Sequence, residues 1–407
     1  MYVHVPFCLF LCRFCDFVRT TDVRPETLAA AVAHTRTEIA TTTARYHLRG
    51  IPIKAVYFGG GTASLLRLDQ VAMLLDELYR YFDVEADAEL TFEGECLSLL
   101  KRGYLDGLRE LGFRRLSFGI QTVNETARAV LNLRPTLRQL QRLGYEAQDR
   151  FDEVSVDFIF GWPSQSAELA TEDLARTLQL VPLTSVELFR FEKSDASPAL
   201  MGELYRAGLH DGVTAELQAH LVSLTEVLTG HGLRRLSFSK FGHTARYAGY
   251  VYEQCYYGWG DGAVLGFGRG AQSFFGGAMW GNALSPTDYA ATVTAGEVPI
   301  DAFAPYRRGE REAVTWPRRG HVVPSQLGAA ADSMYRFRLD ALERAGYSTC
   351  RDDTVALTTE GHTWVPSIMD YLMPPRQRAW RCRLARMRLG PRSLPAPAGT
   401  ARGPGAG

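Results

Sequence analysis

Residues 2–15 read YVHVPFCLFLCRFC, a short apolar stretch followed at once by three cysteines. Cys8, Cys12 and Cys15 fall in one loop, and the next cysteine in the chain is Cys96. Thiolates of this kind hold iron–sulfur clusters. The spacing therefore predicts a 4Fe-4S cluster bound through three cysteines, with one iron left open to a ligand from outside the chain.

A zinc ion is the alternative metal for these cysteines. Structural zinc is normally closed by four protein ligands, and His4 is the nearby candidate for a fourth. Because His4 lies on the strand side of the loop with an unusual spacing, we favour the cluster.

The amino-acid composition does not indicate binding to nucleic acid or to a membrane surface. The 407 residues contain 45 Lys and Arg against 45 Asp and Glu, which favours neither nucleic acid nor an anionic membrane surface. The apolar N-terminus is broken by His4 and Pro6 and makes a poor signal peptide, and no stretch reaches the roughly 18 to 20 apolar residues of a membrane span. An odd number of cysteines suits metal binding better than a disulfide framework. We expect a cytoplasmic protein that acts on a small molecule.

The first half of the chain alternates apolar, β-branched runs with segments of helical period. This rhythm is typical of a parallel sheet with crossover helices, and six such units predict an α/β fold, a partial (β/α)6 TIM-like barrel. The clearest helix is 69–82, where Asp69 can cap and the apolar residues at 71, 74, 75 and 78 form one stripe. The expected strands are 2–5, 55–58, 89–92, 115–120, 154–160 and 185–191.

Composition also divides the chain. We expect a core barrel over 1–194, an extension lining the active site over 195–304, and a small helical domain over 305–374, entered through a charged connector at 305–317. The tail, 375–407, is rich in Arg, Pro, Gly and Ala and is predicted to be disordered.

Polar or glycine-rich residues follow several of the expected strands, where barrels of this kind place their chemistry. Gly59, Gly60, Gly61 and Thr62 form a turn that lets backbone donors approach a ligand. Period-2 alternation places Glu93 and Glu95 on one face of the next strand. Gln121 follows the expected strand 115–120, and Asp157 lies within the expected strand 154–160. An ordinary turn or a solvated acidic pair is the alternative for each motif taken alone.

Taken together and in this order, the segments resemble the radical S-adenosylmethionine (radical SAM) family of oxygen-independent coproporphyrinogen oxidases and their relatives. The resemblance implies that SAM chelates the open iron and that an electron from the cluster cleaves it to a 5′-deoxyadenosyl radical, the cofactor supplying the difficult chemistry. It also implies a winged-helix-like C-terminal domain and a flavodoxin- or ferredoxin-type electron donor. The matching segments are 2–8, 59–66, 116–121, 133–134, 156–165, 265–273 and 357–364.

The same resemblance assigns residues to the cofactor. It implies that Asp157 accepts from the ribose hydroxyls, Arg134 pairs with the carboxylate and Glu93 holds the ammonium; a salt bridge at the barrel rim is the alternative for each. Gln254 aligns with a glutamine at a second SAM molecule. Further contacts are implied for the backbone at Phe14 and for Tyr2, Gly60, Gly61, Thr62 and Gln121.

Departures from the parent pattern favour one branch of the family. Phe17 stands where the porphyrinogen oxidases carry a further cysteine, and the heme chaperones have a histidine where this chain has Gln254. With the short N-terminus and Glu93-Gly-Glu95, these departures favour the class C radical SAM methyltransferases and cyclopropanating enzymes. We therefore expect two SAM molecules and alkylation of an sp2 carbon. The expected substrate is an unsaturated or aromatic small molecule, either a natural product or a tetrapyrrole-like compound. A companion methyltransferase is an expected partner. Porphyrinogen decarboxylation, a heme-opening methyltransferase and a heme chaperone stay open as alternatives.

Two further features have both a functional and a packing interpretation. Cys255 could donate a hydrogen atom or proton to the final intermediate, or be a small packed residue. The dense aromatic residues of 247–275 could line a pocket for a flat substrate, or fill the core of the extension.

Overall fold

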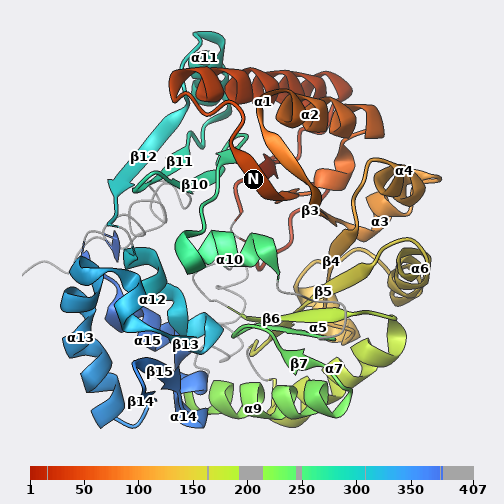
Figure 1. The fold of residues 1–407 in the computed structure, drawn as a ribbon. Helices are drawn as coiled ribbons and strands as arrows, with labels where there is room; N and C mark the ends of the chain where they lie inside the picture. Colours follow the sequence, from red (N-terminus) through yellow and green to blue (C-terminus); the bar gives the residue numbers. More distant parts are fainter. Residues whose placement is uncertain are drawn as a thin grey trace, which may run out of the picture.

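A nine-stranded sheet forms the centre of the molecule (Figure 1). The computed structural model describes residues 1–15, 17–162, 165–191, 214–243, 250–307, 309–375 and 377–378. The strand order is β7-β8-β6-β5-β4-β3-β2-β1-β9, so the first six strands follow one another in space as in sequence. This is the partial barrel of parallel strands that the rhythm of the sequence predicts.

All six expected strands are confirmed. Each is hydrogen-bonded in parallel to its neighbour, and their carboxyl ends therefore meet along one edge. Register pairs His4 with Gly59 and Gly119 with Asp157. The strands are β1 (Tyr2–Val5), β2 (Pro52–Gly60), β3 (Asp83–Gly94), β4 (Arg115–Gln121), β5 (Glu153–Phe160) and β6 (Ser185–Arg190).

Helices cover the outer face of the sheet (Figure 1). In α2 the predicted stripe of Val71, Leu74, Leu75 and Leu78 is fully buried against the strands. The predicted cap is wrong: the helix begins one residue earlier, and Asp69 instead pairs with an arginine ahead of it at 2.7 Å. The covering helices are α1 (Pro25–Arg45), α2 (Leu68–Tyr81), α3 (Cys96–Leu99), α4 (Tyr104–Glu110), α5 (Glu125–Val130), α6 (Leu137–Gln148) and α7 (Ala167–Leu180), with a short 3-10 turn η1 (Ala63–Leu65).

The extension closes the two edges of the sheet. Strand β8 (Lys240–Gly242) runs antiparallel to β6, and β9 (Gly266–Phe267) runs parallel to β1. A second, three-stranded antiparallel sheet stands beside α1. The remaining elements are α9 (Thr214–Gly230), β7 (Arg234–Arg235), α10 (Val251–Tyr257), η3 (Trp259–Asp261), β10 (Gln272–Phe275), β11 (Ala278–Asn282), α11 (Pro286–Thr294) and β12 (Ile300–Pro305).

The C-terminal unit differs from the expected helical domain. Most of the predicted connector is helix α12 (Glu310–Arg319), which continues through Pro317 although proline lacks the backbone N–H that would donate to the residue four positions earlier. A three-stranded antiparallel sheet, β13-β15-β14, packs with the helices around buried Trp316 and Tyr335. A winged-helix fold is not confirmed. The other elements are β13 (His321–Val322), η4 (Pro324–Leu327), α13 (Ala329–Arg344), β14 (Ser348–Arg351), β15 (Thr354–Leu357), α14 (Thr359–Thr363) and α15 (Val365–Leu372).

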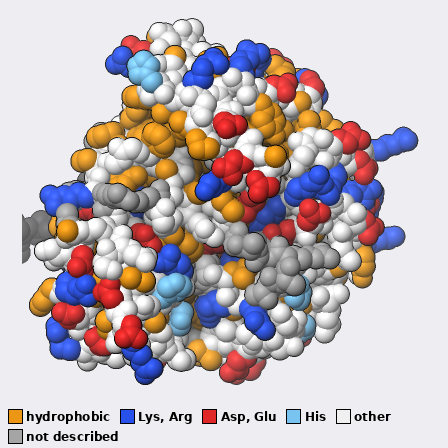
Figure 2. Space-filling model, viewed as in Figure 1, with side chains coloured by type: hydrophobic (Ala, Val, Ile, Leu, Met, Phe, Trp, Pro, Cys, Tyr) orange, Lys and Arg blue, Asp and Glu red, His pale blue; other side chains and the backbone are white. Residues whose placement is uncertain are grey.

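The predicted domain boundaries and the predicted disordered tail stay predictions. The proposed domain boundaries are neither supported nor contradicted, and nearly all of the tail expected to be disordered lies outside the described residues. Within the described part of the chain, none of the helices is both long and apolar enough to cross a bilayer. Positive and negative side chains are interspersed over the face shown in Figure 2, as expected from equal numbers of acidic and basic residues.

Candidate active site at the carboxyl edge of the sheet

The three N-terminal cysteines lie in a loop that begins where β1 ends. Cys8 is buried and receives a hydrogen bond from the Thr62 hydroxyl at 3.6 Å, whereas Cys12 and Cys15 are half-buried. Burial, followed by the nearby Cys15 and Cys8, raises the pKa of the Cys12 thiol to about 12. The thiols therefore lie close enough to interact, and a bound metal centre would be needed to hold them as thiolates.

Arg19 organises this loop, a role that the sequence alone did not reveal. Its guanidinium donates to the carbonyl oxygens of Cys12 at 3.4 Å, Cys15 at 2.5 Å and Phe17 at 2.7 Å. On the other side, the Asn132 side-chain amide donates to the Leu11 carbonyl at 2.8 Å. The loop is thus fixed from both flanks.

A structural zinc ion at these cysteines would normally need a fourth protein ligand, and His4 is the nearby candidate. An iron–sulfur cluster instead spreads its ligands over separate iron atoms. His4 does not supply a fourth ligand, since its Nδ1 lies 2.9 Å from the Tyr2 hydroxyl and its Nε2 lies 3.2 Å from the Val18 carbonyl oxygen.

The glycine turn at the end of β2 lies against the cysteine loop. A Cβ on Gly61 would come within 2.6 Å of the Phe7 carbonyl oxygen, and one on Gly60, whose φ is +111°, within 2.7 Å of the His4 ring. A Cβ on Gly59 would meet the Glu93 carboxylate at 2.6 Å. Only glycine fits this turn, which brings backbone beside both the cysteines and Glu93.

The Glu93 side chain points into the barrel, beside Tyr57. Its carboxylate accepts a hydrogen bond from the Tyr57 hydroxyl at 2.9 Å, and burial, with a contribution from Glu187, raises its pKa to about 7. Burial together with Glu93 and Glu187 also raises the pKa of Asp157 well above its ordinary value, with Lys240 and Arg115 acting in the opposite direction. Neither Glu93 nor Asp157 forms an ion pair with any other described residue, so this part of the barrel suits a cationic ligand.

Gln121 supplies an unsatisfied polar group at the same edge. Its Oε1 is buried and has no hydrogen-bond partner among the described residues, and its backbone φ is +66°. A buried amide oxygen without a partner is costly. The glycine turn, the two uncompensated acids and this free acceptor together fit a compact cofactor that carries positive charge and hydroxyl donors.

Three further expectations have different outcomes. Glu95 does not share the face of Glu93, because β3 ends at Gly94 and the Glu95 carboxylate caps α3, accepting from the Leu97 and Ser98 amides at 2.9 and 3.2 Å. Phe14 packs in a small apolar cluster at the carboxyl edge, where a flat ring could be held. Arg134 is exposed in the loop between α5 and α6, and its role at the carboxylate of SAM stays a prediction.

Comparison with known proteins agrees with this geometry. Residues 2–176, which contain the cysteines, the glycine turn, Glu93, Gln121 and Asp157, match the Radical SAM superfamily. This stretch is therefore similar to a Radical SAM domain. The solved structure of coproporphyrinogen III oxidase (HemN) from Escherichia coli superposes on 91% of the chain and 89% of its own, with a TM-score of 0.76 and 21% identity, and so has the same fold.

Two curated relatives extend the comparison. An oxygen-independent coproporphyrinogen III oxidase of Synechocystis sp. is 32% identical over 196 residues, 47% of this chain and 41% of the relative. The heme chaperone HemW of Mycobacterium tuberculosis is 26% identical over 389 residues, 92% of this chain and 94% of the relative. The predicted methyltransferase and cyclopropanase branch finds no support in these relatives, and neither does the count of two SAM molecules.

Helix α10 packs against the strands of the central sheet (Figure 1). Charged residues of the strands contact the helix and the residue ahead of it. The Glu89 carboxylate accepts from the Val251 amide at 2.9 Å. Arg115 lies between Glu89 and Glu153, at 3.7 and 2.5 Å, and its guanidinium carbon is 3.6 Å from the centre of the Tyr250 ring. None of these residues was predicted, because the partners lie far apart in the sequence.

The aromatic residues of this region pack against one another. Tyr252 stacks on Tyr57 with 4.6 Å between ring centres, and Tyr256 contacts Phe274 edge-on at 5.6 Å. These contacts favour the core-packing interpretation for the described residues, whereas Tyr247 lies outside them.

Cys255 and Gln254 lie on α10, away from the cysteine loop. Burial, with Glu89 adding to it and Lys54 opposing it, raises the pKa of the Cys255 thiol, which places the thiol near the first residues of β2. This is the opposite end of the strand from Gly60. The position favours a packed residue over a hydrogen donor. Gln254 is exposed, and its role at a second SAM molecule stays a prediction.

Proposed function

We propose that the chain is a radical SAM enzyme of the coproporphyrinogen oxidase-like type, with a 4Fe-4S cluster on Cys8, Cys12 and Cys15. The observation that carries the proposal is the meeting of the cysteine loop, the glycine turn and Glu93 at one edge of a parallel sheet. When bound, the cluster and SAM supply a 5′-deoxyadenosyl radical.

The chain's own residues have distinct tasks in this proposal. Glu93 and Asp157 offset the positive charge of SAM inside the barrel, and Gln121 Oε1 accepts one of its donors. Thr62 and Arg19 hold the cysteine loop through Cys8 and the two following cysteine carbonyls. Tyr57 fixes the orientation of the Glu93 carboxylate through its hydroxyl. Each of these groups acts by binding or positioning.

We further propose a tetrapyrrole substrate and, as the leading reaction, oxidative decarboxylation of a porphyrinogen. The relatives named above act, by their names, on coproporphyrinogen III or on heme, which supports the substrate class. A heme carrier is less well supported. The heme chaperones have a histidine at the position of Gln254, and histidine is a better axial ligand for heme than glutamine.

Alkylation of an sp2 carbon is the second candidate. Phe17 stands where porphyrinogen oxidases carry a further cysteine, and this position lies in the loop that Arg19 organises. The substitution therefore falls inside the proposed site, where a change of reaction would be expected to show.

The test is anaerobic reconstitution with iron and sulfide, followed by assay with reductant and SAM. Iron–sulfur absorption and formation of 5′-deoxyadenosine are expected for the wild-type protein, and loss of both for a variant with all three cysteines changed to serine. With coproporphyrinogen III, release of carbon dioxide supports decarboxylation, whereas isotopic methyl from SAM in the product supports alkylation. Stoichiometric heme binding without SAM cleavage would show a carrier and refute the enzymatic proposal.

A further inference from the structure

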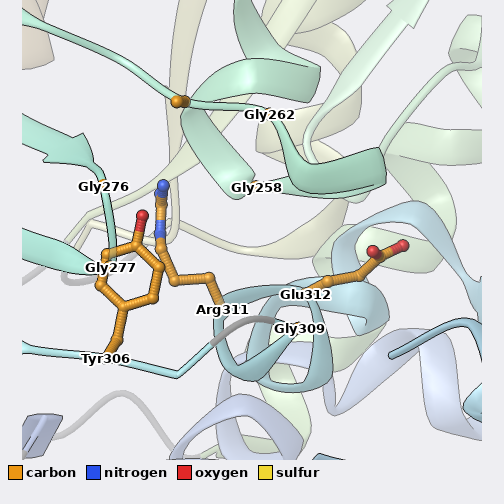
Figure 3. Close-up of a pocket in the computed structure, with 9 residues that line it drawn as sticks. Gly258, Gly262, Gly276, Gly277, Tyr306, Gly309, Arg311 and Glu312 are labelled. Atoms are coloured by element: carbon orange, nitrogen blue, oxygen red, sulfur yellow. The ribbon is translucent and has the colours of Figure 1, made fainter. Parts of the chain in front are cut away.

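A small, partly open cavity of about 180 Å3 lies outside the candidate active site. It is bounded by the end of α10, the turn between β10 and β11, and the start of α12 (Figure 3). The wall consists of five glycines from these segments together with Ala263, Tyr306, Arg311 and Glu312. None of the three N-terminal cysteines and none of the barrel acids lines it.

Arg311 is the charged group that this cavity leaves uncompensated. The residue is only 8% exposed. Its Nη2 donates to the Tyr256 carbonyl oxygen, and its guanidinium carbon lies 3.7 Å from the centre of the Phe274 ring. Its Nη1 is buried without a hydrogen-bond partner, and no carboxylate among the described residues pairs with it. A buried guanidinium without a counter-ion is costly, so the site calls for an anion.

The neighbouring acid does not fill this role. The Glu312 carboxylate accepts from the Gly260 amide at 3.2 Å and pairs with Arg319 at 2.9 Å. Figure 3 shows the Glu312 side chain directed away from the Arg311 guanidinium, which instead lies beside the Tyr306 ring. The charges of Glu312 and Arg319 therefore balance each other, and among the described residues Arg311 is left without a carboxylate partner.

Glycine keeps the approach to Arg311 open. A Cβ on Gly258, whose φ is +75°, would come within 3.1 Å of the Arg311 Cβ and 3.6 Å of its Nη1. At the opposite wall, Gly276 and Gly277 have φ of +59° and +77°, and a Cβ on Gly276 would meet nothing within 4 Å. The space in front of the guanidinium is thus bounded in part by glycine backbone, with the Tyr306 ring beside it.

We propose that this cavity binds a small monocarboxylate whose carboxylate group pairs with Arg311 and whose apolar body lies against Tyr306 and the glycine walls. One free guanidinium donor and the nearby Glu312 favour a single negative charge over a phosphate dianion, which needs several donors. At about 180 Å3 the cavity is smaller than the roughly 300–1,000 Å3 of drug-sized ligand sites. It therefore excludes a whole tetrapyrrole and is a separate site from the one proposed above.

Calorimetric titration of the full chain with benzoate tests the proposal. Benzamide, which has the same shape without the charge, is the matched ligand control, and inorganic phosphate probes the alternative anion. We expect saturable 1:1 binding of benzoate, with benzamide at least tenfold weaker and phosphate weaker than benzoate. Equal binding of benzamide, tighter binding of phosphate, or no saturable benzoate binding would overturn it.

Two variants place the ligand in the cavity. Arg311→Met should weaken benzoate binding at least tenfold, whereas Arg336→Met, which removes an arginine from a surface ion pair on α13, should leave it unchanged. If Arg311→Met does not fold, Ala263→Phe fills the cavity from its wall while keeping the arginine, and should abolish binding with the same melting temperature. Wild-type affinity in a folded Arg311→Met or Ala263→Phe variant would refute the proposal.

The outcome is independent of the radical chemistry. Protein with its three N-terminal cysteines changed to serine should bind benzoate as well as the wild type, because none of these cysteines lines the cavity. Failure of SAM cleavage and failure of benzoate binding can therefore be told apart.

Discussion

Glu93→Gln should make the cluster-free protein more stable at neutral pH while weakening its binding of SAM. Burial raises the pKa of Glu93 from 4.5 to about 7 in the folded protein. Between these pH values the unfolded chain releases a proton that the folded protein keeps, so the free energy of unfolding falls as pH rises and levels off above about 7. At roughly 1.4 kcal/mol per pH unit, the loss is on the order of 3 kcal/mol.

Glutamine removes this loss because its amide stays neutral and its oxygen can still accept from the Tyr57 hydroxyl. Urea unfolding of the apo proteins at pH 5 and pH 8 should therefore show Glu93→Gln gaining stability over the wild type as pH rises. SAM affinity should fall roughly tenfold or more, the value of a lost charge-assisted hydrogen bond. Glu95→Gln is the matched control: it weakens the cap of α3 and should leave SAM affinity unchanged. The same pH dependence in Glu93→Gln and wild type, or a less stable variant at pH 8, would refute the reasoning.

Three other substitutions test the remaining structure. Gly60→Ala should lower the free energy of unfolding by on the order of 1–3 kcal/mol and weaken SAM binding. The reason is that the backbone at residue 60 has φ of +111° and the new Cβ would meet the His4 ring. An unchanged melting temperature would contradict the close packing. Arg115→Met should lower stability by about 3–5 kcal/mol, since it leaves Glu153 buried without its partner at 2.5 Å, and a change under 1 kcal/mol in urea unfolding would show that the pair is dispensable. Cys255→Ala should form 5′-deoxyadenosine and product at wild-type rates, and a selective loss of product would restore the hydrogen-donor role.

The parallel strands and the cysteine loop could be predicted because their signals are local. Alternation within each strand and the repeated helix-period segments suffice to place β1 to β6, and three closely spaced cysteines indicate the cluster without knowledge of the fold.

The errors lie where a regular pattern ends. Glu95 was placed with Glu93 because period 2 contains no signal for the end of a strand, and the helix that follows is only four residues long. Helix α12 was missed because Pro317 indicates a break, yet the helix continues through Pro317 to Arg319. The sequence likewise has no local signal for the contact of Arg115 with Tyr250 or for the clamp of Glu89 on α10, since these partners are more than 130 residues apart.

Helix α10 also has a mechanical consequence. Its first turn is tied to the barrel through Glu89, and its last turn is tied to α12 through the Tyr256 carbonyl oxygen and Arg311. Between these two ties, Tyr252 rests on the ring of Tyr57, the residue that orients Glu93. Helix α10 therefore couples the C-terminal unit mechanically to the barrel. A displacement of α12 would move Tyr252 and, through Tyr57, the Glu93 carboxylate in the proposed SAM site.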